Sequence, residues 1–491
     1  MPRNFLAIDL GAESGRAICG AFDGERLTLS EVHRFANSPV RLPDGLHWDV
    51  LRLWSEIKES IGRAAHSDQP PVSVGLDTWG VDFGLLDRTG TLLSNPYHYR
   101  DSRTDTMVDE AFRRMPRDKI FDATGIQFMP INTLYQLLSM VVADSPVLRA
   151  ADRLLTMPDL FNYWLSGQQA GEFSIATTTQ CYDPRGRDWA RSLLTSMGIP
   201  AHIFPPLIAP GTVLGLLQGA VAEDTRATGL QVIAPACHDT GSAVAAVPSA
   251  NEHFAWISSG TWSIMGTNVP EPIINADSLN NNFTNEGGVG GQYRFSKNIL
   301  GLWLIQESRR TWAAGGQSLS YAELTDMAAQ SEPFAAIIDP DYADFLKPGD
   351  MPARIRSFCV RTGQCAPASP GAIVRCALES LALKYRWILA KIEAMIGYRL
   401  EPIHIIGGGT QNRLLNQFTA DATGRRVITG PIEATAIGNL LTQAVALGDI
   451  GSFEEARSVV KQSFTPEVYE PKSSTGWAEA YQKLLTVMRA T

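Results

Sequence analysis

The sequence predicts an α/β protein made of two similar lobes. Short apolar strands alternate with amphipathic helices up to about residue 235, a pattern typical of α/β domains. A strand–loop–strand layout at residues 5–22 returns at residues 254–266, and each copy opens one half of the 491-residue chain. We therefore expect an N-terminal lobe of residues 1–243 and a C-terminal lobe of residues 244–491.

The N-terminal lobe is expected to open on a hairpin of two antiparallel strands. Strands are predicted over residues 5–8 and 17–22, joined by a loop over residues 9–16 that contains Gly11 and Gly15. A Rossmann or Walker loop would lead from a strand into a helix instead. Glycines at these positions let backbone amides wrap an anion, although a plain hairpin turn would also use Asp, Gly and Ser.

The next elements follow from hydrophobic spacing. Residues 50–65 are predicted to form a helix with Leu51, Trp54, Ile57 and Ile61 on its buried face, and residues 72–76 a buried strand. Residues 81–86 are expected to pair as the next strand. Asp77 and Asp82 flank the turn between these strands, and we interpret Asp77 as a structural residue.

The C-terminal lobe repeats the hairpin and adds a second glycine loop. Helices are predicted over residues 373–395, 414–423 and 434–447, and a buried strand over residues 403–406. Gly407, Gly408 and Gly409 join this strand to the next helix, so backbone amides and a helix N-terminus can face a ligand there. Three successive glycines are costly in entropy, which favours a closely approaching ligand over simple packing.

Charge excludes some classes of protein. The chain has 51 acidic and 42 basic side chains and a formal net charge of −9. Binding nucleic acid through overall charge requires a cationic surface, so that class is excluded, and anionic membranes are disfavoured for the same reason. A small anionic ligand is still compatible with this charge, because one loop can bind a phosphate.

Cysteine spacing and apolar runs indicate a cytoplasmic protein. The six cysteines have no C-x-x-C or zinc-finger spacing, so we expect buried, reduced thiols. Residues 1–16 lack the apolar stretch of a signal peptide. No uninterrupted run of about 18 apolar residues occurs, so no membrane span is expected.

An ordered set of motifs resembles the FGGY family of sugar kinases. The set comprises Asp9-x-Gly11, His238-Asp239, Ser259-Gly260-Thr261 and Gly407-Gly408-Gly409 with Asn412, together with residues 77–83, 99–104, 125–137, 284–288 and 297–303. The motifs run from residue 5 to about residue 440. The resemblance implies two actin-like, ribonuclease-H-like lobes around a central cleft, and an ATP-dependent sugar kinase.

The resemblance also assigns the nucleotide site. It implies that ATP is bound by Ala12, Glu13, Ser14, Gly15 and Arg16 of the first loop and by Thr261, Gln306, Gly408 and Asn412 of the second lobe. Mg²⁺ is expected near Asp9, through water, because this ion keeps much of its hydration shell. Glu13 departs from relatives such as glycerol kinases, which carry a hydroxyl residue there, so its contact with the phosphates is in doubt.

The sugar site follows in the same way. The resemblance assigns Asp239 as the general base, because a sugar hydroxyl needs a carboxylate to orient it and accept its proton. Gly80, His238, Thr240 and Asn298 are implied as sugar contacts. From the residues alone, Asp239 could equally be a helix N-cap, and capping through one oxygen leaves the other free for substrate.

The implied reaction is phosphorylation of L-rhamnulose to L-rhamnulose 1-phosphate with release of ADP, in L-rhamnose degradation. One alternative is a kinase of another ketose, such as L-fuculose or a pentulose. The other is a catalytically silent actin-like sugar sensor or filament former. The expected partners are the sugar and ATP, without nucleic acid or membrane, and the expected assembly is a monomer or a small homo-oligomer.

Overall fold

The chain folds into two compact units in the computed structural model, which describes residues 2–249, 251–472 and 475–490. Unit 1 comprises Met1–Pro248, Asn268–Phe295 and Glu433–Phe464. Unit 2 comprises Ser249–Thr267, Ser296–Ile432 and Thr465–Thr491. The units alternate along the sequence, and the single lobe boundary between residues 243 and 244 stays a prediction.

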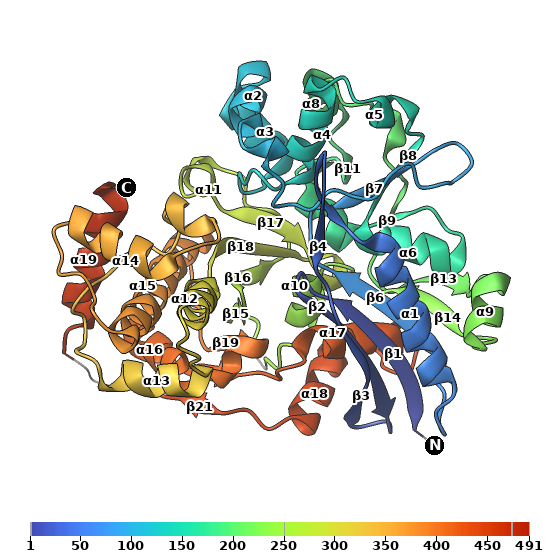
Figure 1. Ribbon diagram of the computed structural model, residues 1–491. Helices are drawn as coiled ribbons and strands as arrows, with labels where there is room; N and C mark the ends of the chain where they lie inside the picture. The colour runs from blue at the N-terminus through green and yellow to red at the C-terminus, as the bar shows by residue number, and fades with distance from the viewer. Residues whose placement is uncertain (1, 250, 473–474, 491) are drawn as a thin grey trace. The chain divides into compact units, whose positions relative to one another are not determined.

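Unit 1 contains a six-stranded mixed sheet (Figure 1). Its strands, in spatial order, are β3 (Leu27–Ala36), β2 (Ser14–Phe22), β1 (Arg3–Leu10), β6 (Ser73–Thr78), β14 (Gln231–Ala234) and β13 (Thr212–Leu216). The strand β1 pairs antiparallel with β2 and parallel with β6, and β6 pairs parallel with β14. The centre of the sheet is apolar because β1 is buried from Asn4 to Leu10.

Unit 2 repeats this succession of strands. The second sheet has seven strands in the order β17 (Thr284–Gly287), β18 (Tyr293–Leu300), β16 (Trp262–Val269), β15 (Ala255–Ser259), β19 (Ile403–Ile406), β20 (Val427–Thr429) and β21 (Val468–Tyr469). The strand β15 pairs antiparallel with β16 and parallel with β19, as β1 does with β2 and β6. The internal similarity predicted from the two hairpins is confirmed.

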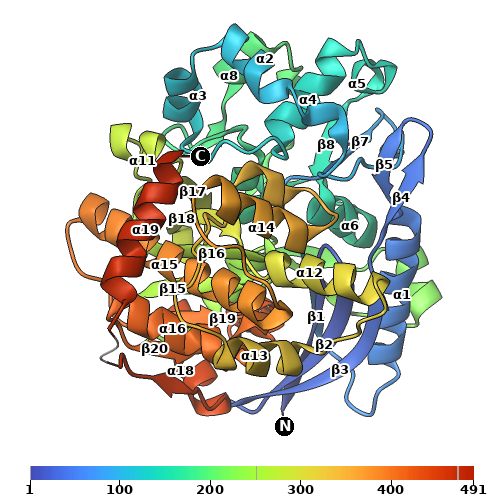
Figure 2. The same cartoon turned by 60° about the vertical axis from the view of Figure 1, so that its left-hand side comes forward.

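Helices surround both sheets. In unit 1 they are α1 (Val50–Ala65), α2 (Met107–Arg114), α3 (Arg117–Thr124), α4 (Thr133–Val142), α5 (Pro146–Ala150), α6 (Met157–Ser166), α7 (Phe173–Ala176), α8 (Arg191–Met197), α9 (Gly219–Thr225), α10 (Asp239–Ala245), α11 (Ala276–Asn280), α17 (Ala434–Ala446) and α18 (Phe453–Ser463). In unit 2 they are α12 (Trp303–Ala314), α13 (Tyr321–Gln330), α14 (Met351–Arg361), α15 (Pro370–Ile396), α16 (Arg413–Thr423) and α19 (Trp477–Ala490). Figure 2 shows α15, α16 and α19 packed side by side. No helix in the described part of the chain is long and apolar enough to cross a membrane.

Two local predictions need correction. The first hairpin loop is not the span from Asp9 to Arg16, because β1 continues to Leu10 and β2 begins at Ser14, so only Gly11–Glu13 form the turn. Leu51 does not lie on the buried face of α1; it is 62% exposed, and Leu53 is buried there instead. Side chains at positions 50, 53, 57, 61 and 64 form the buried stripe, which matches the helical repeat better.

Two further expectations also differ from the structure. The strand β7 (Phe83–Leu86) leaves the main sheet and pairs with β8 (Arg153–Thr156) rather than with β6. The cysteines are not all buried, since Cys365 is exposed and Cys19 is half-buried. Local sequence does not determine a strand's partner, because pairing depends on segments distant in the chain.

The helices α10 and α17 approach each other closely at Gly438. A Cβ added at Gly438 would overlap the backbone oxygen of Ser242 in α10. The same helix α17 crosses Gly75 of β6, where an added Cβ would meet the side chains of Asn439 and Gln443. The helix α17 therefore packs closely against both α10 and the β6 strand of the unit-1 sheet.

Gly438→Ala is expected to lower the melting temperature, because the extra methyl group forces α10 and α17 apart. Overpacking of this kind costs about 1–3 kcal/mol, and more where backbone must move. Gly219→Ala in α9 is the control, since no atom lies within 4 Å of a Cβ added there. Thermal unfolding of both variants tests the packing, and an unchanged melting temperature for Gly438→Ala contradicts it.

Candidate active site

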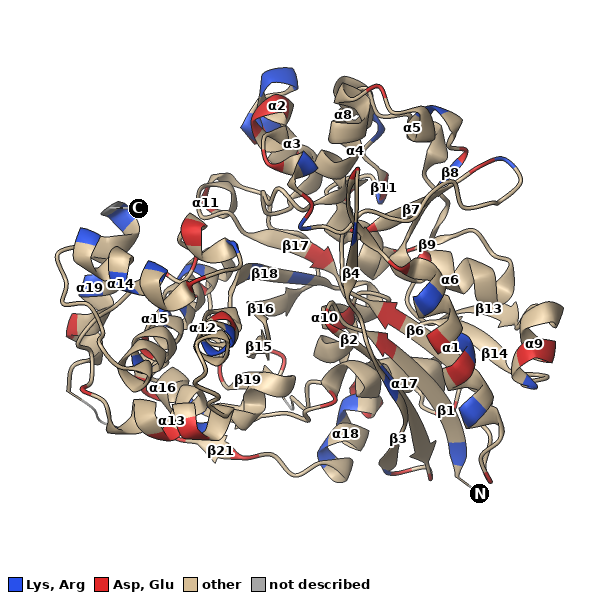
Figure 3. Cartoon of the chain, in the orientation of Figure 1, with Lys and Arg blue, Asp and Glu red and all other residues tan. Residues whose placement is uncertain are grey.

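Three carboxylates meet at one edge of the unit-1 sheet. Parallel pairing of β1 with β6 sets Asp9 opposite Asp77. The next residue of β6, Thr78, forms a parallel bridge with His238, which directly precedes Asp239 at the start of α10. Acidic residues colour the ends of β1 and β6 and the start of α10 in Figure 3. The strand pairing thus gathers side chains from three distant segments.

Asp9 is clamped by an arginine. Arg16 donates from Nε and Nη2 to Asp9 Oδ2 at 2.9 and 2.8 Å, and its Nη1 lies 2.6 Å from Glu433 Oε2. Asp9 Oδ1 has no hydrogen-bond partner among the described residues. One oxygen of this carboxylate is therefore held in place while the other is available to a ligand.

Asp77 lies inside the carboxylate cluster, which was not expected of a structural turn residue. Its side chain is fully buried, and Asn439 donates to Asp77 Oδ2 at 2.6 Å. Its Oδ1 has no hydrogen-bond partner in the described part of the chain. Burial and the charge of Asp9 raise the pKa of Asp77 well above its usual range. The signal that could have revealed it is its position, since Asp77 and Asp9 are each the second-last residue of a buried strand.

Asp239 has two oxygens in different environments. Its Oδ1 accepts from Thr240 N at 2.5 Å and from Thr240 Oγ1 at 3.0 Å, and His238 Nε2 lies 3.3 Å away. Its Oδ2 has no partner among the residues described, and 31% of the side-chain surface is exposed. Burial by the surrounding protein, and then the charge of Asp9, raise the pKa of Asp239 to about 7.

A second buried acid holds the segment that leads to Asp239. Glu172 accepts from Cys237 N at 3.0 Å and from Ser174 Oγ at 2.6 Å, and Ser174 Oγ accepts from His238 N at 3.1 Å. Glu172 is fully buried and also caps α7. The backbone before α10 is therefore fixed by side chains that the sequence analysis did not single out.

Gly80 precedes a strained turn. Asp82 N donates to Gly80 O at 3.0 Å across Val81, whose φ is 71°. Such a γ-turn is rare, and a β-branched residue at positive φ is strained. Thr178 Oγ1 accepts from Val81 N at 3.1 Å, and Thr133 Oγ1 donates to Val81 O at 2.5 Å. Surrounding side chains therefore hold Gly80, the predicted sugar contact, in one position.

Asp82 anchors the far end of this turn. Its Oδ2 accepts from the indoles of Trp48 and Trp79 at 2.6 and 2.9 Å, and its Oδ1 accepts from Gln136 at 2.8 Å. Burial raises the pKa of Asp82 to about 6, although these donors act against the shift. Both oxygens of Asp82 accept hydrogen bonds from the protein, so Asp82 is a structural acid that positions Trp79.

The turn between β1 and β2 is closed by its own backbone. Gly11 N donates to Ser14 O at 2.9 Å, and Asn37 binds both ends of the turn through Gly11 O and Glu13 O, each at 2.9 Å. Glu13 and Ser14 are exposed, and Ala12 is half-buried. Gly15 is buried, and a Cβ there would overlap the ring of Phe35. Gly15 is thus required by packing, while the exposed tip carries the amides that could meet phosphate.

In unit 2 the hairpin and the triple glycine touch each other. A Cβ at Gly409 would overlap Ser259 Oγ, and Gly407 has a φ of 85°. These two glycines are therefore explained by packing and backbone conformation, contrary to the expectation that a ligand accounts for all three. Gly408 differs, because no atom lies within 4 Å of a Cβ added to it. Open space at this position fits a ligand.

The remaining predicted residues of unit 2 lie near this junction or on the sheet. Gly260 O and Thr261 O accept from Leu302 N and Trp303 N at 2.9 and 3.1 Å, which ties the hairpin to α12. Gln306 Oε1 in α12 is buried and has no partner in the described part of the chain. Asn412 caps α16 by accepting from Leu415 N at 3.0 Å. Asn298 is half-buried in β18.

The acidic cluster of unit 1 suits a hydrated divalent cation. Hard oxygen donors are what Mg²⁺ prefers, and Asp9 Oδ1 and Asp77 Oδ1 both lack hydrogen-bond partners among the described residues. Burial, and after it the charge of Asp9, raises the pKa of both Asp77 and Asp239. No group of three acidic, histidine or cysteine side chains within the described ranges forms a direct ligand set.

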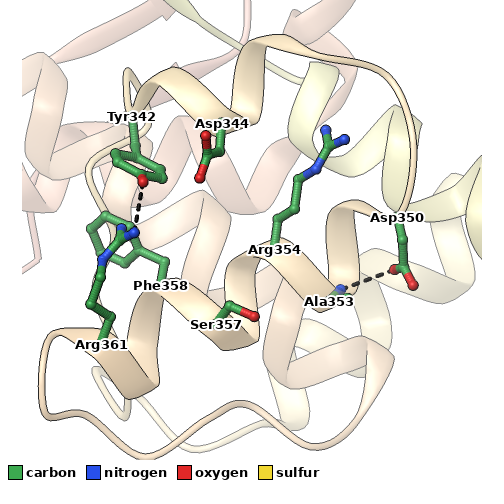
Figure 4. Close-up of a pocket in the computed structure, with 8 residues that line it drawn as sticks. All are labelled: Tyr342, Asp344, Asp350, Ala353, Arg354, Ser357, Phe358 and Arg361. Atoms are coloured by element: carbon green, nitrogen blue, oxygen red, sulfur yellow. Dashed lines mark hydrogen bonds between the residues drawn. The ribbon is translucent and has the colours of Figure 1, made fainter.

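A separate surface hollow in unit 2 does not involve these residues (Figure 4). It has a volume of about 320 Å³ and is lined by Tyr342, Asp344, Asp350, Ala353, Arg354, Ser357, Phe358 and Arg361. Arg361 donates to the hydroxyl of Tyr342 at 2.6 Å, and Asp350 caps α14 through Ala353 N. Arg354 also donates to the backbone oxygen of Pro348 at 3.0 Å, so both arginines of the hollow have partners within the protein.

Family models match both halves of the chain. The N-terminal domain of the FGGY family of carbohydrate kinases matches residues 4–246, and the C-terminal domain of the same family matches residues 255–447. A rhamnulokinase of Bacteroides thetaiotaomicron is 42% identical over 481 residues, which cover 98% of each chain. A rhamnulokinase of Bacillus subtilis is 38% identical over 468 residues, 95% of each chain.

Solved structures agree on the fold. A gluconate kinase of Lactobacillus acidophilus superposes with a TM-score of 0.81 at 15% identity, covering 100% of this chain and 98% of that one. A glycerol kinase of Plasmodium falciparum with ADP has a TM-score of 0.78 at 15% identity, covering 100% and 97%. The expected pair of actin-like α/β domains is confirmed, and the chain belongs to the FGGY family of carbohydrate kinases.

Proposed function

We propose that this carbohydrate kinase transfers a phosphoryl group from ATP to the C1 hydroxyl of L-rhamnulose, giving L-rhamnulose 1-phosphate and ADP. Full-length relatives at 37–42% identity named rhamnulokinase support the substrate. The chemistry rests on one observation about Asp239: one of its oxygens is held by Thr240, and the other has no partner among the described residues. We place the enzyme in the cytoplasm, which fits the lack of cysteine pairs at redox-motif spacing. We expect it to act as a monomer or small homo-oligomer.

Asp239 would act as general base. Thr240 holds Oδ1, so Oδ2 is left to accept a hydrogen bond from the sugar hydroxyl and then its proton as the new P–O bond forms. A base whose pKa lies near neutral pH is well matched to this task. His238, Thr240 and the backbone of Gly80 would orient the ketose beside it.

The nucleotide would be held by backbone groups and a few side chains. In unit 1 the turn Ala12–Gly15 and Arg16 would meet the phosphates, and in unit 2 Thr261, Gln306, Gly408 and Asn412 would contact the nucleotide. Gln306 Oε1 supports this assignment, because it is a buried acceptor without a partner in the described chain. Asp9 would hold Mg²⁺ through water, and the ion would offset the charge of the phosphates.

The assay that tests this function is ADP release with a panel of ketoses. Purified enzyme, ATP and Mg²⁺ are combined with L-rhamnulose, L-fuculose, ribulose or xylulose. We expect the highest kcat/KM with L-rhamnulose. A higher value with another ketose reassigns the substrate within the family, and no ADP release with any sugar would leave a catalytically silent sensor as the better description.

Asp239→Asn is expected to lower kcat by about 10²- to 10⁴-fold, because an amide cannot accept the proton. Nucleotide binding, followed by calorimetry, should change little, since Asn keeps the size and the Oδ1 contacts. Asp87→Asn, in the exposed turn after β7, is the matched control and should keep normal turnover. Near-normal kcat for Asp239→Asn would end its assignment as base.

The kcat/KM for the sugar should fall as pH drops below about 7. Burial and the charge of Asp9 raise the pKa of Asp239, so this carboxylate takes up a proton in that range and loses its function as base. A pH profile between pH 5 and pH 9 checks this, with nucleotide affinity measured in parallel. A flat profile down to pH 5 would contradict the role of the raised pKa.

A further inference from the structure

Behind His238 lies a buried ion pair to which the proposed reaction assigns no role. Arg294 in β18 is fully buried, and its Nη2 lies 3.1 Å from Glu286 Oε2 in β17 (Thr284–Gly287). Arg294 also donates from Nε to Gly287 O at 2.8 Å. Burying such a pair is costly, and replacing it by apolar residues is often neutral or stabilising. Stability alone therefore does not explain why Glu286 and Arg294 are buried together.

The same guanidinium contacts the histidine beside the proposed base. Arg294 Nη2 lies 2.8 Å from His238 Nδ1. A guanidinium has five N–H donors and no acceptor, so Nδ1 must supply the lone pair and carry no proton. A neutral imidazole then has its proton on Nε2. Burial and the charge of Arg294 lower the pKa of His238 well below its usual range, which keeps the ring neutral.

The opposite tautomer fits these contacts poorly. A proton on Nδ1 would point at the donor of Arg294 at 2.8 Å, and the nearest alternative acceptor, Glu286 Oε2, lies 3.4 Å away. It would also turn the bare lone pair of Nε2 toward Asp239 Oδ1, 3.3 Å away. With the proton on Nε2, the ring instead presents a positive edge to this oxygen. The charged groups on three sides of His238 thus favour the neutral ring with its proton on Nε2. These groups are Asp239, Glu286 and Arg294.

We propose that Glu286 and Arg294 are positioning residues that hold His238 as its Nε2–H tautomer and thereby orient the carboxylate of Asp239. His238 joins the two donors of Thr240 in attracting Oδ1, so that Oδ2 is turned toward the sugar. Glu286 neutralises the guanidinium and keeps it in place. The catalytic part of this inference rests on the proposed function of Asp239, whereas the tautomer of His238 does not.

The test is the double variant Glu286→Gln/Arg294→Met, which removes both charges together and leaves no unpaired buried ion. Its matched control is Arg375→Met/Glu379→Gln in α15, where the two side chains are 12% and 1% exposed and lie 2.8 Å apart. Nitrogen-15 NMR of histidine-labelled full-length protein identifies which ring nitrogen of His238 carries the proton. The His238→Asn variant assigns that signal among the eight histidines.

In the unmodified protein we expect His238 to carry its proton on Nε2 at neutral pH. The Glu286→Gln/Arg294→Met variant should show a mixture of tautomers or a protonated ring, and its kcat should fall about 10- to 100-fold, because misplacing a catalytic group costs up to about 10²-fold. Affinity for ATP should stay within about twofold. The control double variant should keep the wild-type tautomer and kcat. Arg294→Lys, which retains a cationic donor, should recover part of the loss.

Two results overturn the proposal: a proton on Nδ1 of His238 in the unmodified protein, or an unchanged tautomer in the Glu286→Gln/Arg294→Met variant. A shifted tautomer with unchanged kcat overturns the orienting role of the pair. Failure of the unmodified enzyme to release ADP with any ketose overturns the proposed function instead, and the NMR measurement still decides whether Arg294 sets the tautomer.

Discussion

The parallel pairing of β1 with β6 is the constraint on which the site in unit 1 depends. It aligns Asp9 with Asp77, and the bridge from Thr78 to His238 then brings Asp239 to the same edge. Three carboxylates at this edge repel one another, and the protein answers with Arg16 on Asp9, Asn439 on Asp77 and Thr240 on Asp239. Each of these partners engages one oxygen of its carboxylate.

Repulsion of this kind has a chemical use. A carboxylate in water loses its proton near pH 4 and is a weak base, whereas burial and the charge of Asp9 raise the pKa of Asp239 to about 7. The helix α17 supports this cluster, since it supplies both the Asn439 amide that binds Asp77 and the close packing on α10.

The sequence predicted elements that depend on local spacing and missed features that depend on tertiary partners. Both hairpins, the helix over residues 50–65 and the strand over residues 403–406 follow from apolar periodicity and turn residues, and the structure has them. The pairing partner of β7 could not be predicted from the neighbouring sequence, because β8 lies about 70 residues further along the chain. The turn after β1 was predicted too long because Gly15 resembles a loop residue, although packing against Phe35 places it in a strand.

Site residues divide in the same way. Asp239, His238 and the glycine loops carry motifs that can be recognised in sequence. Glu172 and Arg294 have no such signal, and Glu286 lies in a recognised motif, residues 284–288, that did not indicate its role. Each of the three acts through a neighbour that only the fold supplies. A buried acid at the end of a strand is also ambiguous by itself, as the different outcomes for Asp77 and Asp82 show.

Hydrogen-bond satisfaction separates the structural acids from those available to ligands. Asp82 and Asp239 both have a raised pKa, to about 6 and about 7, so the shift alone does not distinguish them. Asp82 has donors on both oxygens, from Gln136 and from two indoles, and no capacity is left for a ligand. In the described chain, one oxygen of Asp239 and one of Asp77 lack such donors. A buried polar atom without a partner is costly, so the unpartnered oxygen of the fully buried Asp77 is best explained by a substrate or cation that completes it.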